Sequence, residues 1–460
     1  MRIRFALAVP VLTLLACTGA GEGGASATPH ATHVPSRPAV TSPAAAGGPA
    51  DWPTYHGNRL RTGYAPTMPA ASGAPKVLKR YTLDGNVYAS PVVVGGRVFV
   101  ATENDTVYAM QSGKVVWRKH LGTPAPHRQL PCGNIFPLGI TGTPVYRNGV
   151  VYVAAEFSGS PPHHTLFALR ASTGAVIWKH GLDLKGVETK AMQDRGALVY
   201  AGGRIWVPFG GLAGDCGNYK GRVVGVNVTG AHGAIKYTVP TTREAGIWTT
   251  PGPSFGGKYL FVAVGNGAAS FGDAYDKSDS ILKITMGAHL YQYFAPASWA
   301  SDNASDADLG SQAPAIVGKW VFADGKSGHA YVLHRYHLGG IGGAVSRTNL
   351  CTSFGGTAVV GSRVYVPCTD GIRAVRIDST GHLHVVWHAA GQVVGSPVVG
   401  GGRVWSLDPG AGRLYALNPS TGGVVNSVDV GVTSRFATPA IYGYRMFVPT
   451  LSGVTVVGTS

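Results

Sequence analysis

The chain has 460 residues and a formal net charge of +16, with 67 glycines, 30 prolines and only 13% charged residues. This composition is typical of a turn-rich β-sheet protein and argues against a helical one. The excess of Lys and Arg suggests nucleic acid as a partner. However, no basic run or basic stripe with interleaved aromatic residues is present, so we exclude that class.

Residues 1–17 are predicted to be a targeting signal, because Arg2 and Arg4 precede an apolar run that is too short to span a bilayer. The run ends in Leu14-Leu15-Ala16-Cys17, which resembles a bacterial lipobox, and we expect lipidation of Cys17. The alternative is an ordinary secretory signal with an incidental cysteine.

Residues 18–50 are rich in Ala, Pro, Thr and Gly and are expected to form a disordered tether. No second apolar run of spanning length follows. The sequence therefore predicts an exported, monomeric protein that is held at the outer face of the cell membrane by its lipid anchor alone.

The remaining residues, 51–460, are predicted to form one domain built from repeats. Residues 89–117 predict four short strands separated by turns, with β-branched and aromatic residues in the strands. Four antiparallel strands of this size cannot bury both of their faces, so copies of the unit must stack.

Copies recur along the chain. A small residue, a proline and an apolar run mark the first strand of the unit at Pro91, Pro144, Pro251, Pro314, Pro397 and Pro439. Degenerate copies at residues 196–200 and 356–360 fill the two long gaps. The sequence thus predicts an all-β, eight-bladed β-propeller of four-stranded antiparallel blades. The last blade lacks a fourth strand, and we expect residues 76–83 to close it.

Two further landmarks recur in register with the first. A basic residue opens the second strand of seven units, and a Thr-Gly or Ser-Gly turn precedes the last strand of five. The ring of strand-opening cations predicts only a weak attraction to anionic lipid or cell-wall polymer, because salt screens such charges.

Besides Cys17 there are four cysteines, which allow three pairings in an exported protein. Connections between blades and loops between second and third strands share one face of a propeller, and this geometry favours Cys351–Cys368. Cys132 and Cys216 then pair across blades two and three. No Cys-x-x-Cys-His motif occurs, so no covalent haem is expected.

The same geometry locates a candidate site. Insertions at residues 156–164, 208–221 and 265–279 all lie between second and third strands of neighbouring units. They are therefore expected to crowd one face of the propeller, as loops that carry function do.

Two motifs near the start of the domain carry a family resemblance, namely Trp52-Pro53-Thr54-Tyr55 and Arg61-Thr62-Gly63-Tyr64. With the blade pattern, they make residues 51–460 resemble the pyrroloquinoline quinone (PQQ) repeat superfamily. This superfamily contains quinoprotein alcohol dehydrogenases and also non-catalytic assembly lipoproteins. Fold alone does not choose between them.

The resemblance to the dehydrogenases implies roles for particular residues. Trp248, in Gly246–Pro251, resembles the tryptophan that stacks on the quinone, and Lys326 resembles the cation at the quinone carbonyls. Glu156 and Asn266 resemble two ligands of calcium, an ion that prefers oxygen ligands and would polarise the quinone carbonyl.

The catalytic base is less clear from the resemblance. Asp273 matches its segment only with one inserted residue, and Asp276 is the alternative. The family's adjacent cysteine pair and cytochrome domain are absent from the sequence.

Each of these residues also has a purely structural interpretation. Trp248 could cap an inner strand, Asn266 could be an ordinary turn residue, and Glu156 and Lys326 could lie on solvated loops. The acidic residues of the loop at 265–279 could simply solubilise it.

Two functions follow. One is a PQQ- and calcium-dependent alcohol or polyol dehydrogenase acting on a small-molecule alcohol. The other is a non-catalytic propeller that binds a ligand, an envelope protein or a polymer.

Overall fold

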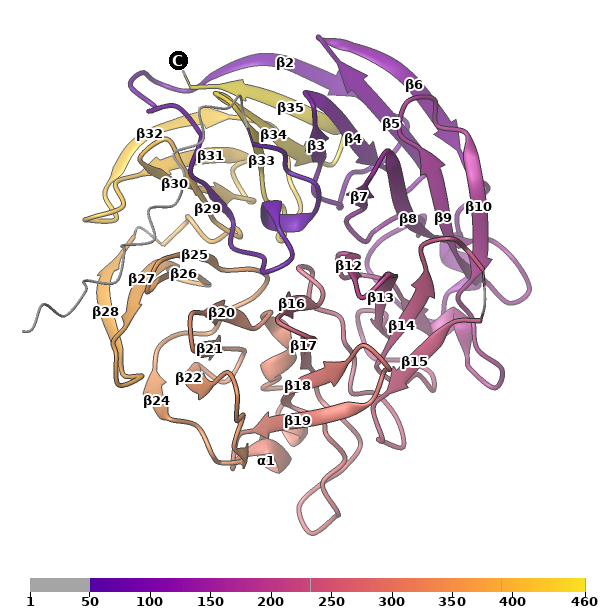
Figure 1. Ribbon diagram of the computed structural model, residues 1–460, viewed down its shortest axis with the longest axis vertical. Helices are drawn as coiled ribbons and strands as arrows, with labels where there is room; N and C mark the ends of the chain where they lie inside the picture. The colour runs from indigo at the N-terminus through magenta and orange to yellow at the C-terminus, as the bar shows by residue number, and fades with distance from the viewer. Residues whose placement is uncertain (1–49, 232, 390, 460) are drawn as a thin grey trace, which may run out of the picture. The chain divides into compact units, whose positions relative to one another are not determined.

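The computed structural model describes residues 50–459 except 232 and 390. The predicted signal with Cys17 and nearly all of the predicted tether lie outside these residues. The described part forms eight four-stranded antiparallel sheets arranged around a ring (Figure 1). The predicted eight-bladed β-propeller is therefore confirmed. No helix in the described ranges is long and apolar enough to cross a membrane.

The first four blades follow one another along the chain, and each begins with a short inner strand. Blade one consists of β3 (Val92–Val94), β4 (Arg97–Ala101), β5 (Thr106–Gln111) and β6 (Lys114–His120). Blade two consists of β7 (Val145–Arg147), β8 (Val150–Phe157), β9 (His163–Arg170) and β10 (Val176–Gly181). Blade three consists of β12 (Val199–Ala201), β13 (Arg204–Gly211), β14 (Arg222–Asn227) and β15 (Ile235–Thr238), with β11 (Met192–Gln193) paired to the end of β13. Blade four consists of β16 (Ser254–Gly256), β17 (Tyr259–Val264), β18 (Ser280–Thr285) and β19 (Leu290–Ala295).

The next three blades repeat the pattern. Blade five consists of β20 (Ala315–Val317), β21 (Trp320–Ala323), β22 (His329–His334) and β24 (Ser346–Asn349), and β23 (Gly340–Ile341) pairs with β19 of blade four. Blade six consists of β25 (Ala358–Val360), β26 (Arg363–Cys368), β27 (Gly371–Ile377) and β28 (Leu383–His388). Blade seven consists of β29 (Val398–Gly400), β30 (Arg403–Asp408), β31 (Arg413–Leu417) and β32 (Val424–Asp429), with β1 (Tyr64–Ala65) added in parallel to β29.

Blade eight joins the two ends of the domain. It consists of β33 (Ala440–Tyr442), β34 (Arg445–Thr450), β35 (Gly453–Gly458) and β2 (Lys76–Thr82). Strand β2 pairs antiparallel with β35, so the segment expected to close the last blade does so. The closure covers the outer edge of β35, which would otherwise expose unpaired backbone groups.

Among the described residues, helical structure occurs in short connecting segments. These are η1 (Tyr55–Gly57), η2 (His127–Gln129), η3 (Thr189–Ala191), α1 (Trp299–Ala304) and η4 (Leu309–Ser311).

The core lies between neighbouring blades rather than within them. One apolar cluster joins Phe99 of β4 to Val153 of β8, and similar clusters join the later pairs of blades. Each buried aliphatic or aromatic side chain of this kind contributes about 1.5–3 kcal/mol. A blade therefore depends on its neighbours, as the repeat pattern predicted.

A tryptophan on the outer strand of one blade packs against the Thr-Gly turn of the next blade, and this contact explains why the glycine recurs. The indole N–H of Trp117 in blade one donates to the carbonyl of Ala171 in blade two at 3.0 Å. A Cβ on Gly174 would lie 2.6 Å from the same ring, so only glycine allows the contact. Trp178 and Trp387 make the same pair of contacts with the turns of blades three and seven.

The first prediction concerns the closure of blade eight. Gly453 begins β35 with φ +145°, and a Cβ there would overlap the carbonyl oxygen of Tyr81 in β2. We expect Gly453→Ala to push β2 away and to lower the free energy of unfolding by about 3 kcal/mol or more. Guanidinium unfolding of the purified chain measures this effect.

The matched control is Gly402→Ala, since Gly402 also has a positive φ, +72°, in the turn between β29 and β30, but has open space around it. We expect this control to lose only about 1 kcal/mol, the cost of backbone strain. Equal losses in the two variants would show that the contact between β2 and β35 does not support the fold.

Candidate functional site

A cavity of about 530 Å³ opens on the face formed by the connections between blades and by the loops between second and third strands. Its wall combines aromatic rings, cations and carboxylates from seven different connections. The lining residues are Tyr88, Asn134, Ile135, Gln193, Arg195, Gly211, Leu212, Ala213, Gly214, Asp215, Trp248, Asp306, Asp308, Lys326, Phe354, Ser434, Arg435 and Phe436.

Two arginines of the cavity face aromatic rings. The guanidinium carbon of Arg195 lies 5.3 Å from the ring centre of Tyr88 and 5.2 Å from that of Phe436. The guanidinium carbon of Arg435 lies 3.9 Å from the ring centre of Phe354. Within residues 50–459, apart from 232 and 390, neither arginine forms an ion pair or donates a side-chain hydrogen bond.

Burial lowers the pKa of both arginines, and the nearby Glu103 carboxylate opposes the shift at Arg195. Guanidinium nevertheless stays protonated in proteins. The cavity wall therefore holds two cations, each with donors left for a ligand.

A lysine and two carboxylates form the opposite part of the wall. The Nζ of Lys326 lies 2.6 Å from a carboxylate oxygen of Asp306 and 2.6 Å from one of Asp308. Burial raises the pKa of Asp308, while the charge of Lys326 lowers it. The second oxygen of Asp308 is buried and has no hydrogen-bond partner among the described residues.

Trp248 lies in the cavity wall between β15 and β16. Its ring centre is 6.3 Å from that of Phe436, with the ring planes at 70°. Gly210 leaves room for the side chain, because a Cβ there would lie 2.7 Å from the Cβ of Trp248. The structure thus brings two of the predicted site residues, Trp248 and Lys326, into one cavity.

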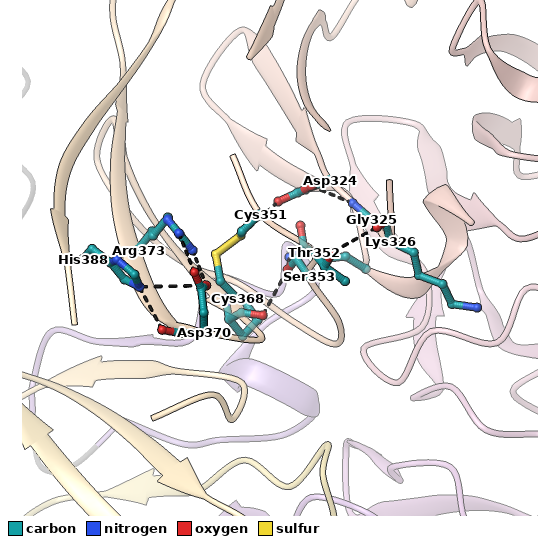
Figure 2. The surroundings of a disulfide bond; sticks show 12 residues. Asp324, Gly325, Lys326, Cys351, Thr352, Ser353, Cys368, Asp370, Arg373 and His388 are labelled. Atoms are coloured by element: carbon teal, nitrogen blue, oxygen red, sulfur yellow. Dashed lines mark hydrogen bonds and ion pairs between the residues drawn. A yellow bond between two sulfur atoms is a disulfide. The ribbon is translucent and has the colours of Figure 1, made fainter. Parts of the chain in front are cut away.

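A disulfide supports the position of Lys326 (Figure 2). Cys351 and Cys368 are bonded, and the segment after Cys351 lies against the turn that carries the lysine. The Thr352 hydroxyl donates to the Lys326 carbonyl at 3.1 Å, and the Ser353 amide donates to Gly325 at 3.0 Å. The disulfide therefore ties blade six to the Lys326 turn of blade five.

The second disulfide, Cys132–Cys216, lies at the edge of the cavity, with 6.2 Å between its Cα atoms. Cys132 precedes Asn134 in the connection to blade two, and Cys216 follows Asp215 in the loop of blade three. Both predicted pairings are present. The Cys132–Cys216 bond links two segments of the cavity wall, those that carry Asn134 and Asp215.

The predicted calcium ligand Asn266 lies just behind the wall. Its side-chain amide donates to Asp306 at 2.8 Å, and its Oδ1 atom is buried without a partner among the described residues. Asn266 therefore does not line the cavity, but it is hydrogen-bonded to Asp306, which does.

The other predicted ligand, Glu156, belongs to a different network. It lies near the end of β8 and accepts a hydrogen bond from His164 at 3.1 Å, and His164 bonds to Asp183 at 2.8 Å. Burial would lower the pKa of His164, but the carboxylates of Glu156 and Asp183 raise it to about 10. His164 is therefore charged and donates from both ring nitrogens.

No contact joins the networks of Glu156 and Asn266. Within the described residues, no group of three or more His, Cys, Asp or Glu side chains is arranged to hold a metal ion. The assignment of the two residues to one calcium ion stays a prediction.

The two predicted bases lie outside the cavity lining. Asp273 accepts hydrogen bonds from the amide and hydroxyl of Ser270 at 2.9 and 2.8 Å, and Asp276 accepts one from the hydroxyl of Ser278 at 2.6 Å. Both carboxylates stabilise the turns of their own loop. The cavity offers Asp308 instead, which sequence reasoning missed because it lies in a connection without a repeat signal.

A second group of buried carboxylates lies near Arg195. Burial raises the pKa of Glu103 to about 7, against hydrogen bonds from Gly139 and Thr141. Burial and the neighbouring charges of Glu103 and Glu156 raise the pKa of Asp105 to about 9. Both oxygens of Asp105 lack hydrogen-bond partners among the described residues.

These groups give the second prediction. Glu103 and Asp105 have folded pKa values above their unfolded values near 4, so their contribution to stability is lost as pH rises through the folded values. We expect the free energy of unfolding to fall from about pH 4 to about pH 9, by about 1.4 kcal/mol per pH unit for each proton that the folded chain binds and the unfolded chain does not. Guanidinium midpoints across this range measure the slope.

The variant Asp105→Asn isolates one group, and Asn also tolerates the positive φ of 52° at this position. We expect it to flatten the slope up to pH 9, whereas Glu103→Gln flattens the slope only up to about pH 7. An unchanged slope in Asp105→Asn would contradict the assignment.

Comparisons with known proteins bear on the fold and the family. Residues 70–336 and 340–458 match the family model described as "Outer membrane protein assembly factor BamB". The search of curated proteins finds no match.

Three solved structures are similar in fold. Quinohemoprotein alcohol dehydrogenase from Comamonas testosteroni has 16% sequence identity and a TM-score of 0.69, covering 89% of this chain and 80% of its own. A europium-containing methanol dehydrogenase has 14% identity and a TM-score of 0.67, covering 88% and 90%. BamB from Moraxella catarrhalis has 16% identity and a TM-score of 0.58, covering 83% and 99%.

At these identities the structural likeness establishes the fold alone. The family model, however, matches most of the sequence, including all eight blades. The chain therefore belongs to the PQQ-repeat propeller family that is described by the outer membrane protein assembly factor BamB.

Proposed function

We propose that the chain is an exported propeller that binds PQQ in the central cavity and oxidises a small alcohol or polyol. The fold supports the proposal only in general terms, because propellers of this family serve different functions. The chemistry of the cavity wall carries the argument.

The observation that carries it is the pair of arginines that form no ion pair among the described residues. Arg195 and Arg435 present guanidinium groups beside aromatic rings in a cavity of about 530 Å³. PQQ is a planar aromatic quinone that bears carboxylates, and guanidinium binds carboxylates through paired hydrogen bonds. Trp248 supplies a flat apolar surface in the same wall.

Other residues of the wall suit the reaction. PQQ, when bound, supplies the electron acceptor for alcohol oxidation. Lys326 is a cation that can stabilise negative charge on a ligand carbonyl, and Asp308 is a buried carboxylate with one free oxygen. We assign Asp308 the role of accepting the alcohol proton, since it is the buried one of the three carboxylates that line the cavity, Asp215, Asp306 and Asp308.

The calcium ligands expected from the resemblance stay a prediction. Glu156 Oε1 and Asn266 Oδ1 are buried oxygens without partners among the described residues, and oxygen is the ligand that calcium prefers. Their hydrogen bonds lie in separate networks, so we give the ion no step in the proposal.

Export and anchoring also belong to the proposal. Two disulfides in the described part suit an oxidising compartment. The lipid anchor at Cys17 rests on the sequence motif alone. Acyl-chain detection by mass spectrometry of the membrane-extracted protein, compared with a Cys17→Ser variant, checks it.

A second candidate is a non-catalytic propeller that binds an envelope protein or polymer. The match to the family model described as an assembly factor favours it. This candidate requires no ligand in the cavity, so quinone binding separates the two functions.

The third prediction concerns this binding. We expect PQQ to co-elute with the purified chain, with and without added calcium. Arg195→Gln and Arg435→Gln should each weaken binding by about 10- to 100-fold, since a charge-assisted hydrogen bond contributes about 1.5–3 kcal/mol. Isothermal titration calorimetry measures the affinities.

The matched control is Arg376→Gln, because Arg376 is exposed on β27 and does not line the cavity. It should bind PQQ like the unmodified chain. If the unmodified chain fails to bind PQQ under both calcium conditions, the dehydrogenase proposal is wrong and the scaffold function is favoured.

The fourth prediction concerns the base. In the quinone-loaded protein, Asp308→Asn should lower alcohol-dependent dye reduction by about 10²-fold or more, which is typical of the loss of a general base. Asp273→Asn and Asp276→Asn should leave the rate within about twofold, because both residues bond only within their own loop. A loss in Asp273→Asn with full activity in Asp308→Asn would reverse the assignment.

A further inference from the structure

The outer strands of blades eight and one carry a concentration of cations. Strand β2 contains Lys76, Lys79 and Arg80, and the neighbouring strand β6 contains Lys114, Arg118 and Lys119. Neither strand contains an acidic residue. The outer strands of blades four, six and seven (β19, β28 and β32) contain no Lys or Arg.

Most of these cations have no ion-pair partner among the described residues. Arg80 pairs with Asp429 at 3.0 Å, but within the described residues the other five cations of β2 and β6 form no ion pair. The carboxylate next to this region in the sequence, Asp84, is occupied by the hydroxyls of Thr102 and Thr106. The concentration of charge is therefore not neutralised by the protein itself.

Exposed aliphatic side chains lie among the cations. Leu78 on β2 is 51% exposed, and Val115 and Val116 on β6 are 45% and 48% exposed. Similar exposed valine pairs occur on β28 and β32, so the aliphatic residues alone do not distinguish this side of the ring. What distinguishes it is the combination of aliphatic residues with cations.

A groove of about 490 Å³ runs between the same two blades. Leu78, Met110 and Phe447 give it apolar walls, and Lys79 and Arg445 place cations beside them. In Figure 1, β2 and β6 are the adjacent indigo and purple strands at the rim of the ring. The surface made by β2, β6 and this groove is called the basic rim below.

We propose that the basic rim binds the surface of a membrane that contains anionic phospholipids. Cations attract the phosphate headgroups, each contributing several-fold to binding near such a surface. The exposed aliphatic residues and the apolar groove suit the hydrocarbon just beneath the headgroups. A wholly hydrophilic anionic polymer would bind the cations but would gain nothing from the exposed aliphatic side chains.

This inference does not depend on quinone binding in the cavity, which lies on a different part of the propeller. It differs from the attraction expected of the strand-opening cations, because all cations of the basic rim except Arg445 belong to outer strands. The tertiary structure places β2 in blade eight, next to blade one, because β2 pairs with β35 at the other end of the domain.

The fifth prediction tests the basic rim with vesicles. The full chain carrying Cys17→Ser, so that no acyl chain contributes, should sediment with vesicles of phosphatidylcholine and phosphatidylglycerol but not with phosphatidylcholine alone. Lys79→Glu, Lys114→Glu and Lys119→Glu, combined, should weaken this binding by about 100-fold. All three side chains are exposed, and the corresponding glutamine substitutions serve if the triple variant does not fold.

The matched control reverses three exposed lysines of other blades, Lys236, Lys258 and Lys319, to glutamate. It has the same net charge as the test variant and should keep binding within about threefold. Equal losses in the two triple variants would overturn the proposal, because net charge rather than the basic rim would then govern binding.

A second variant separates a lipid surface from an anionic polymer. Leu78→Ser, Val115→Thr and Val116→Thr, combined, remove apolar area and leave the cations in place. If the proposal is correct, vesicle binding falls at least tenfold while binding of soluble polyphosphate is unchanged. Unchanged vesicle binding with full competition by polyphosphate would assign the basic rim to an anionic polymer and overturn the proposal.

Discussion

The buried guanidinium of Arg61 ties the N-terminal segment of the domain to the inner strands of the ring. It donates to the hydroxyl of Thr54 at 2.6 Å, to the carbonyl of Leu198 before blade three at 2.9 Å, and to that of Pro253 before blade four at 3.2 Å. Inner strands that meet around an axis leave backbone carbonyls without partners, and buried carbonyls need donors. Arg61 supplies these donors from a segment that belongs to no blade.

His56 does the same for the other side of the ring. One ring nitrogen lies 3.1 Å from the Thr357 carbonyl before blade six, and the other lies 3.1 Å from the Thr438 hydroxyl before blade eight. Burial lowers the pKa of His56 to about 3, so the ring is neutral and accepts one of these bonds. The indigo segment toward the middle of the ring in Figure 1 thus links blades three and four with blades six and eight, which lie far from them in sequence. This segment contains the two motifs on which the family resemblance rests. In the structure, His56 and Arg61 of this segment hold the inner ends of the blades together.

The cavity is built on this framework from connections rather than strands. Arg195, Trp248 and Arg435 each lie in the connection that leads into a new blade, where the chain is free to vary without disturbing the sheets. Lys326 lies in a turn that the Cys351–Cys368 disulfide supports (Figure 2). The disulfide thus holds the segment after Cys351 against the turn that carries Lys326.

The sequence by itself determined the blades, because three landmarks recur in register: an inner proline in six blades, a strand-opening cation in seven, and a Thr-Gly or Ser-Gly turn in five. The tertiary structure shows why these residues recur. For example, Gly174 leaves room for the ring of Trp117, which a Cβ would displace. The resemblance to the quinoprotein dehydrogenases indicated Trp248 and Lys326, and propeller geometry indicated both disulfides. The sequence could not identify Asp308 or Arg435. The positions of these residues depend on contacts between blades that are distant along the chain. A pattern within one repeat carries no information about which side chains of other repeats face it across the axis.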